Sequence, residues 1–314
     1  MNYSPEELQR LQDALYQTLA EVDRICRKHG IRYFVTGGTA IGAYFWGKIL
    51  PWDDDVDVGM MRPDYERFAK VAQQEMGDRF FLQSPETEPH TPFYFMKVRM
   101  NGSRFSESTF CHIDMHQGIY VDIFPFDRIP RQRWLQRLQQ KTVFALNGLF
   151  IATEIWQWKH FGKCDIPEPR KRGWLPCLVT RLLITLLSKR TIYNIMYRVQ
   201  TAFNRGKGQG ARGKEQDARG KEQGARGKRI QDARGKEQVK NVITRSEYLP
   251  VADIVEAQTV ALGPLQVSAP RDLLLYLTNH YGQVRKDIPD EMKVSHRPAE
   301  LVFPDNNKKQ TAEE

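Results

Sequence analysis

The sequence predicts an α+β fold, and three features of the N-terminal part of the chain support this class. Apolar residues recur every three or four positions over residues 8–25, which predicts an amphipathic helix. The run 31–35 is β-prone and leads into the glycine pair Gly37 and Gly38. Aspartates and valines alternate over residues 55–58 after two further aspartates, which predicts a further strand. Together these elements predict a sheet covered by helices.

The first helix carries signals at both of its ends. Ser4 and Glu7 form a capping-box pattern, Pro5 suits the first turn, and Gly30 suits the end. A second helix is expected from Pro63 to Met76, just before another glycine. Both helices are therefore expected to frame the strands between them.

The glycine pair predicts a phosphate-binding turn. A strand ends at Thr36, and a helix-compatible stretch runs from Thr39 to Trp46. Backbone N–H groups at a helix N-terminus point outward and carry partial positive charge, and glycine lacks the Cβ that would keep a phosphate away. We therefore expect Gly37, Gly38 and Thr39 to contact phosphate.

The acidic strand predicts a metal site. In an extended strand Asp53, Asp55 and Asp57 share one face, while Val56 and Val58 point into a core. Cα atoms two residues apart lie about 6.6 Å apart, so the carboxylates can converge on Mg²⁺, with Mn²⁺ as an alternative. A solvated acidic turn is the other interpretation, and the preceding glycine pair favours the metal site.

Several sequence blocks together indicate a family. The first three are GGTAIGA, PWDDDVDVGM and RPDYERF, and later blocks lie at 97–99, 118–127, 281–282 and 296–298. These blocks closely resemble the LicD/fukutin family of phosphotransferases. The resemblance implies an α+β, nucleotidyltransferase-like core with a mixed sheet and added helices. It spans roughly residues 30–127 and 262–298, and the middle of the chain has no motif.

The resemblance also implies a reaction. Members of the family transfer a phospho-alcohol, such as phosphocholine or phosphoribitol, from a CDP-linked donor to a glycan hydroxyl and release CMP. The implied partners are a CDP-alcohol donor and a glycan or lipid-linked glycan acceptor, as in lipopolysaccharide, teichoic acid or polysaccharide modification. Two alternatives remain open: a nucleotidyltransferase that makes an activated donor, and a non-catalytic protein that binds glycan or membrane.

The family pattern assigns roles to particular acids. Its glycine pair matches Gly37 and Gly38, its acidic pair matches Asp55 and Asp57, and its third acid matches Asp122. The first two acids would hold Mg²⁺ against the diphosphate. Asp122 would either complete the metal ligands or accept the proton of the acceptor hydroxyl, and we favour the ligand because a metal-bound carboxylate is a poor base. Asp53 would then contact the residues that hold the metal, or the substrate.

For the other candidate residues, a purely structural or surface role is an alternative to a role in binding. Lys97 and Arg99 share a strand face and would pair with phosphate or with the aspartates, or simply face solvent. Trp52 would stack on a base or sugar, or wall the core. His296 would contact nucleotide or glycan, or be a surface histidine. A zinc site at His112 and His116 is disfavoured, because little helix fits between them and Gly118.

The distribution of charge and the cysteine spacing argue against two classes of protein, those that bind nucleic acid and those built on disulfides. The formal net charge is +9, but residues 205–240 hold 12 Lys/Arg against 5 Asp/Glu, a net of +7. That segment repeats Ala-Arg-Gly-Lys four times, and its polar composition predicts disorder instead of a coiled coil. The excess charge therefore gives no reason to expect nucleic-acid binding. The four cysteines form no paired framework and are expected to be reduced thiols.

Two apolar stretches bear on location. Residues 141–158 and 174–199 are both interrupted by polar or charged residues, so neither is a clean membrane span. The second combines leucines with basic residues as interfacial helices do, although a helical cover on the core is favoured. With no secretory signal expected, the protein is predicted to be cytoplasmic, with peripheral attachment to the inner membrane face as an option.

The expected organisation has four parts. Residues 1–130 form the nucleotidyltransferase-like catalytic core, 131–204 a helical elaboration, 205–240 a disordered basic insert, and 241–314 the C-terminal part of the domain.

Overall fold

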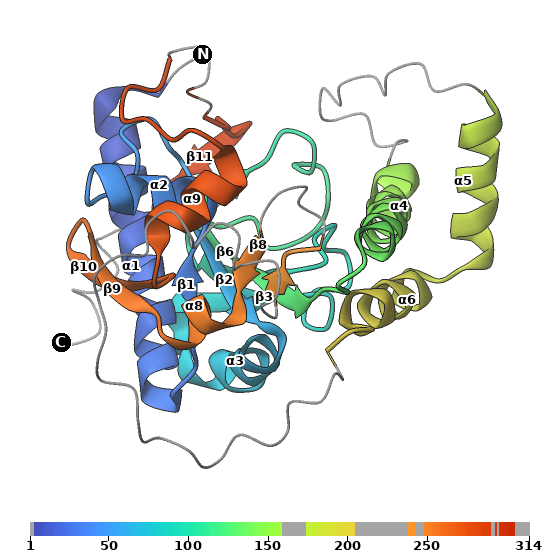
Figure 1. Cartoon of the computed structure of the whole chain (residues 1–314). Coiled ribbons are helices and arrows are strands. Elements are labelled where there is room, and N and C mark those ends of the chain that lie inside the picture. The colour runs from blue at the N-terminus through green and yellow to red at the C-terminus, as the bar shows by residue number, and fades with distance from the viewer. Residues whose placement is uncertain are drawn as a thin grey trace.

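A mixed seven-stranded sheet forms the centre of the computed structural model, which describes residues 3–158, 174–204, 238–242, 248–289, 293 and 295–304 (Figure 1). Five strands lie side by side in the order β1 (Phe34–Val35), β2 (Asp57–Met61), β6 (Tyr120–Arg128), β4 (Met96–Met100) and β3 (Phe80–Gln83). Only the β2–β6 pairing among these is parallel. The predicted α+β class is therefore confirmed.

Helices α1 (Pro5–His29) and α3 (Arg62–Glu75) pack on this sheet, with a 3₁₀ turn (Gly77–Arg79) after α3. The predicted ends of α1 are confirmed: Ser4 and Glu7 form the capping box, and Gly30 ends the helix with φ 58°. Buried leucines along α1, including Leu11, Leu15 and Leu19, join one hydrophobic core with the strands. The amphipathic pattern of the sequence thus sets the face that α1 buries.

The predicted acidic strand begins later than expected. Val56 and Val58 are fully buried as predicted, but strand β2 begins only at Asp57. Asp53, Asp54 and Asp55 lie in the connection between α2 (Gly37–Phe45) and β2. Three consecutive carboxylates at one strand end repel one another, and a connection lets their side chains point in different directions.

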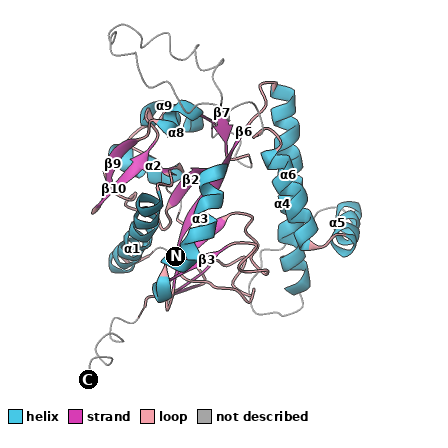
Figure 2. Cartoon of the chain, turned by 90° about the horizontal axis from the view of Figure 1, so that it is seen from below, coloured by secondary structure: helices cyan, strands magenta, loops and turns pink. Residues whose placement is uncertain are grey.

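A helical unit flanks the sheet. It consists of α4 (Arg133–Trp158), α5 (Trp174–Leu186) and α6 (Lys189–Thr201), of which α4 and α6 pack closely around a small core that includes Val143, Phe150 and Ile192. Figure 2 shows α5 set apart from the sheet, on the far side of this pair. None of the described helices is long and apolar enough to cross a membrane.

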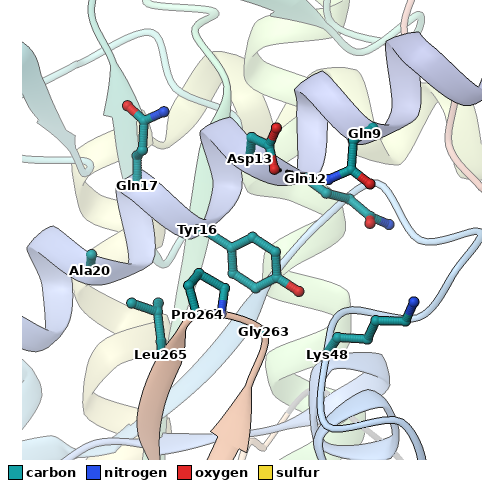
Figure 3. Close-up of a pocket in the computed structure, with 10 residues that line it drawn as sticks. All are labelled: Gln9, Gln12, Asp13, Tyr16, Gln17, Ala20, Lys48, Gly263, Pro264 and Leu265. Atoms are coloured by element: carbon teal, nitrogen blue, oxygen red, sulfur yellow. Dashed lines mark hydrogen bonds between the residues drawn. The ribbon is translucent and has the colours of Figure 1, made fainter.

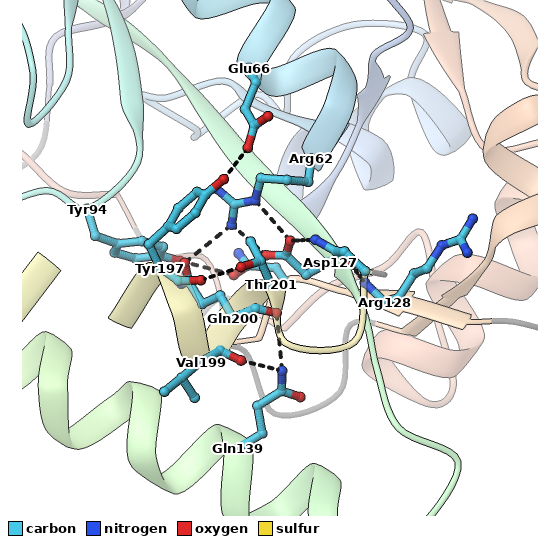
Figure 4. A network of polar contacts seen from close by, with 12 residues as sticks. Arg62, Glu66, Tyr94, Asp127, Arg128, Gln139, Tyr197, Val199, Gln200 and Thr201 are labelled. Carbon is cyan, nitrogen blue, oxygen red and sulfur yellow. Dashed lines mark hydrogen bonds and ion pairs between the residues drawn. The ribbon is translucent and has the colours of Figure 1, made fainter. Parts of the chain in front are cut away.

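A buried ion pair attaches α6 to the core (Figure 4). Arg62 donates from Nε to Asp127 at 2.9 Å and from a terminal nitrogen at 2.5 Å, and both side chains are buried. Gln200 of α6 accepts from the same guanidinium at 3.3 Å, and Tyr197 of α6 donates to Glu66 at 2.5 Å. Two family blocks thus meet here, since Arg62 begins one of them and Asp127 ends another.

The C-terminal residues return to the sheet at several points. Strand β7 (Gln238–Lys240) pairs with β6 and with β8 (Tyr248–Pro250), so the last three residues of the predicted insert are strand, and the repeat before them lies outside the described residues. Beyond them come α8 (Val251–Val255), the hairpin of β9 (Gln258–Leu262) and β10 (Leu265–Ala269), and α9 (Leu273–Tyr281). Finally β11 (Glu300–Val302) pairs with β5 (Arg104–Ser106).

The cysteines differ from expectation at one position. Cys26 is buried with a free thiol, whereas Cys111 is disulfide-bonded. The expectation of reduced thiols throughout is therefore wrong at Cys111, because spacing along a sequence does not reveal which thiols a fold brings together.

Candidate active site

The glycine turn is bound to the acidic strand by backbone and side-chain hydrogen bonds. The Thr36 N–H donates to the Asp57 carbonyl at 3.1 Å, and the Asp57 N–H donates to Thr39 Oγ1 at 2.9 Å. From α9, the Tyr276 hydroxyl accepts from the Gly37 N–H at 3.1 Å and lies 2.5 Å from Thr36 Oγ1. The start of α2 therefore has a fixed position relative to Asp57.

A side chain at either residue of the glycine pair would displace a carboxylate. Gly37 has φ 58°, and a Cβ placed on it would lie 2.7 Å from Asp57 Oδ2. A Cβ on Gly38 would lie 2.7 Å from Asp53 Oδ2. Two carboxylates thus lie directly against the turn. A phosphate would approach this turn together with a cation, because bare phosphate and two carboxylates repel.

Strand register brings the distant Asp122 beside this turn. Asp57 and Asp122 are register partners in the parallel β2–β6 pair, and Lys97 is the partner of Asp122 across β6–β4. Paired residues point to the same face of a sheet, so three charged side chains lie in one row. The Lys97 ammonium lies 2.9 Å from Asp122 Oδ1.

Lys97 is enclosed by protein groups. It is 2% exposed, and its Nζ lies 3.4 Å from the ring centroid of Tyr120 and 4.1 Å from that of Phe93. Glu107 is a second anionic partner at 3.3 Å. Burial raises the pKa of Asp122 to about 6, against the opposing effect of the Lys97 charge. The Lys97 charge is therefore shared between two carboxylates, and Lys97 also belongs to the lining of the cavity beside them.

The connection before β2 gathers acids around the site. Burial, with the nearby carboxylates of Asp55 and Asp54, raises the pKa of Asp53 to about 8, and burial also raises the pKa of Asp55. Tyr3 donates to Asp54 Oδ2 at 2.8 Å. His296 Nδ1 lies 3.8 Å from the other Asp54 oxygen, and this contact raises the pKa of His296 to about 9.

These residues fit a divalent cation. Asp54 Oδ1 is buried and accepts no hydrogen bond from the described residues. Asp54, Asp55 and His296 offer ligand atoms within 4.8 Å of one another. Clustered carboxylates with raised pKa values favour neutralisation by a cation, and oxygen ligands suit Mg²⁺. Asp55 belongs both to this cluster and to the set predicted from sequence, whereas Asp57 and Asp122 lie on the neighbouring strands.

A cavity of about 600 Å³ opens beside the acids. Its lining includes Asp55 and Asp122, the aromatic rings of Phe93, Phe95, Phe110 and Tyr120, and the C-terminal residues His296 and Arg297. Glu107 directly follows β5 and Arg297 lies shortly before β11, so the β5–β11 pairing brings these two lining residues to the cavity from distant parts of the chain. Asn147 and Ile151 of α4 complete the lining, so the helical unit contributes to the cavity.

Among the residues predicted from sequence, the cavity lining includes Asp55, Lys97, Asp122 and His296. The lining does not include the glycine turn with Thr39, Asp53, Asp57, Trp52 or Arg99. Arg99 is 1% exposed, and its guanidinium donates to Gln83 Oε1 at 2.8 Å and to the Gly118 carbonyl at 2.7 Å. Trp52 is half-buried against Trp46, with ring centroids 5.7 Å apart. The structure thus gives both side chains partners within the protein. The structure agrees with the expectation that His112 and His116 do not form a zinc site on a helix. Residues 107–117 form no helix, and His116 contacts Asn101 at 2.8 Å.

A second cavity, of about 550 Å³, lies between α1, Lys48 and the β9–β10 turn (Figure 3). Gln12 on its wall donates to the carbonyls of Leu50 and Asp53 at 2.9 and 3.0 Å. Tyr16 accepts from the Ile49 N–H at 2.9 Å. The α1 wall of this cavity therefore holds the backbone of the acidic connection in place. Among the described residues, the lining has no cluster of acids.

The comparisons with known proteins identify the domain. Residues 30–156 match the family model described as LicD/FKTN/FKRP, nucleotidyltransferase domain. Residues 30–156 are a LicD/fukutin-family domain. The matched range contains the glycine turn, the acidic connection, Lys97 and Asp122, whereas the blocks at 281–282 and 296–298, with His296 and Arg297, lie outside it.

Individual relatives match over shorter ranges. The lipopolysaccharide cholinephosphotransferase LicD of Haemophilus influenzae is 28% identical over 114 residues, which cover 34% of this chain and 40% of that protein. The human ribitol 5-phosphate transferase FKRP is 31% identical over 106 residues, or 32% of this chain and 20% of that protein. An uncharacterised Rickettsia typhi protein, RT0683, is 34% identical over 61 residues. This chain thus spans less than half the length of these relatives.

Sequence reasoning missed several residues around the LicD-family site. Tyr3, Asp54, Glu107, Asn147 and Tyr276 all contact or line it. Asp54 belongs to the acidic run and was passed over because strand alternation would turn it away. The other four come from distant segments, and nothing in their local sequence indicates that the fold brings them here.

Proposed function

We propose that this protein transfers a phospho-alcohol from a CDP-linked donor to a hydroxyl group of a cell-surface glycan precursor and releases CMP. The observation that carries the proposal is the close approach of the Asp57 and Asp53 carboxylates to the Gly37–Gly38 turn. A nucleoside diphosphate with a divalent cation uses both backbone donors and carboxylates. Two relatives are named as a cholinephosphotransferase and a ribitol 5-phosphate transferase, and these names support the same class of reaction.

Each residue of the site has a proposed role. Asp55, Asp57 and Asp122 would hold Mg²⁺, with Mn²⁺ as the alternative, and the ion would supply charge neutralisation at the diphosphate. His296 and Arg297 face the same cavity and supply positive charge near the phosphates. The acceptor oxygen bonds to phosphorus as the bond to CMP breaks, and its proton passes to a carboxylate in the cavity.

The product distinguishes the proposal from its rivals. Purified protein would be incubated with Mg²⁺, a panel of CDP-alcohols and a glycan acceptor, and CMP would be quantified. A parallel incubation with Mg²⁺, CTP and the corresponding phospho-alcohols would be assayed for pyrophosphate. CMP release supports the proposal, whereas pyrophosphate formed from CTP and a phospho-alcohol would identify a nucleotidyltransferase. An absence of both products with either Mg²⁺ or Mn²⁺ would favour a non-catalytic binding protein.

The role of Asp122 can be tested separately. As a metal ligand, Asp122→Asn should raise the Mg²⁺ concentration needed for half-maximal activity, and high Mg²⁺ should restore part of the rate. The exposed acid Asp78 provides the control variant Asp78→Asn, which should match the wild type. A uniformly low rate with an unchanged half-saturating Mg²⁺ concentration would assign Asp122 to proton transfer instead.

A further inference from the structure

We propose that α5 and the basic residues around it form a docking surface for an anionic lipid membrane. Leu178, Leu182 and Leu186 follow one another at four-residue intervals, so they share one side of α5. Their exposed fractions are 55%, 57% and 70%. Neighbouring Val179 is also exposed, at 47%. This stripe is a property of the helical unit and is separate from the chemistry proposed above.

The stripe faces away from the protein interior. Leu183 and Ile184, on other sides of α5, are half-buried, and α5 packs against α4. Figures 1 and 2 both show α5 at the periphery, on the side of α4 and α6 that is remote from the sheet. The outward leucines therefore do not contribute to the hydrophobic core that stabilises the helical unit. Contiguous apolar surface of this kind marks an interaction site.

Charge on the helical unit selects the partner. Exposed cations occur along all three helices, at Arg133, Arg137, Lys141, Arg181, Arg190 and Arg198. Glu154 is the sole acidic residue in the described α4, α5 and α6 sequences, and it is 2% exposed and ion-paired with Lys189 at 2.6 Å. Of these cations, Arg181 lies on α5 itself and Arg190 follows Leu186 by four residues. Exposed leucines next to cations, with no exposed acid in the described α4, α5 and α6, match the interface of an anionic bilayer.

A second copy of the chain fits this surface poorly. A symmetric dimer through α5 would bring the same patch from both copies together. Arg181, which is exposed among the leucines, would then approach its own counterpart, as would Arg190 just beyond the helix. Like charges at such an interface are destabilising. A lipid surface with anionic headgroups supplies the opposite charge to these residues and apolar chains to the leucines.

Helix α4 carries both an exposed apolar residue and a residue of the cavity lining. Phe144 is 66% exposed, while Asn147, one turn further along, lines the cavity beside Asp122. One helix therefore joins the exposed side of the unit to the catalytic side. Binding through this unit would keep the cavity near the lipid surface, where a lipid-anchored acceptor is concentrated.

Vesicle co-sedimentation of the full chain tests the proposal. Vesicles of phosphatidylcholine containing phosphatidylglycerol should bind the protein, and vesicles of phosphatidylcholine alone should bind it much less. The double variant Leu182→Gln/Leu186→Gln should bind roughly tenfold more weakly, because two apolar side chains lose their insertion. The matched control is Val255→Gln/Leu274→Gln, which changes two exposed apolar residues on α8 and α9. Thermal unfolding of both variants verifies that they are folded.

Each other outcome overturns the proposal. Equal loss of binding in both double variants would show that general surface hydrophobicity is responsible. Unchanged binding in the α5 variant, with loss of binding when residues 206–236 are deleted, would assign lipid contact to the basic repeat. Failure to bind anionic vesicles would exclude a membrane surface. A wild-type dimer that the α5 variant converts to a monomer in light scattering would identify a second copy as the partner.

Discussion

At the residue scale, the site depends on close approaches that leave no room for substitution. The glycine pair lies under the carboxylates of Asp57 and Asp53, and Asp122 lies between Asp57 and Lys97 in register. The first of these contacts involves the backbone of the glycine pair, and the second involves buried charged side chains. Small changes there should alter chemistry more than they alter folding.

Gly37→Ala is expected to lower both stability and activity. The left-handed backbone costs a non-glycine residue about 1–2 kcal/mol, and the new Cβ would displace the Asp57 carboxylate. The matched control is Gly148→Ala in α4, where nothing lies within 4 Å and the helix should gain about 0.5–1 kcal/mol. Urea unfolding and CMP release measure the two effects. Wild-type activity in Gly37→Ala would contradict the proposed site.

Metal linkage separates the two candidate ligand sets. Mg²⁺ should raise the melting temperature of the wild type, since ligand at a hundredfold excess over Kd stabilises by about 2.7 kcal/mol. Asp57→Asn should abolish this rise, whereas Asp54→Asn should retain most of it. The opposite result would place the ion at Asp54, Asp55 and His296, which also lie within ligand distance of one another.

At the element scale, a buried polar network is one of the connections that join the helical unit to the sheet. Arg62 and Asp127 come from α3 and β6, and Gln200 of α6 completes their network. Gln139 of α4 donates to the Val199 carbonyl at 2.9 Å and so connects α4 to the same end of α6. The position of Asn147 in the cavity therefore depends on a network outside it.

Arg62→Met should destabilise the protein by about 3–5 kcal/mol, because it leaves Asp127 buried without its cation. The control is Arg67→Met on the same helix, whose half-exposed ion pair with Asp64 should contribute about 1 kcal/mol or less. Urea unfolding compares the two. A loss in Arg62→Met no larger than in Arg67→Met would show that the ion pair is dispensable.

The sequence predicted elements better than it predicted their assembly. The capping box, Gly30 and the buried Val56 and Val58 follow from local spacing, and all are observed. The start of β2 was misplaced because the run of aspartates and valines over 53–58 has the strand pattern without strand pairing before Asp57. His296 was named as a candidate, but its approach to Asp54 depends on the β5–β11 pairing, which no local pattern encodes.

At the scale of the whole molecule, the basic repeat interrupts the fold at one place. Asn204, before the repeat, accepts from the Arg128 N–H at 2.8 Å. Gln238, after it, accepts through its carbonyl from the Ile129 N–H at 3.3 Å. Both ends therefore adjoin the last residues of β6, and a short linker can join them.

Replacing residues 206–236 with a short glycine-serine linker should leave the folded state intact. Loop-closure entropy varies slowly with length, so stability should change by about 1 kcal/mol or less. Thermal unfolding and CMP release from a soluble acceptor provide the measurements. Insoluble protein after the replacement would mean that the repeat has a structural role.

The β5–β11 pairing also constrains the order in which the protein can mature during synthesis. Strands β1 to β6 lie within residues 34–128, so a growing chain can pair them while most of the polypeptide is still to be made. His296, Arg297 and β11 leave the ribosome much later, and only then does the cavity gain its last wall. A nascent chain would therefore hold an incomplete acidic site while residues 129–295 are translated. The proposed activity would arise only after His296, Arg297 and β11 have been made.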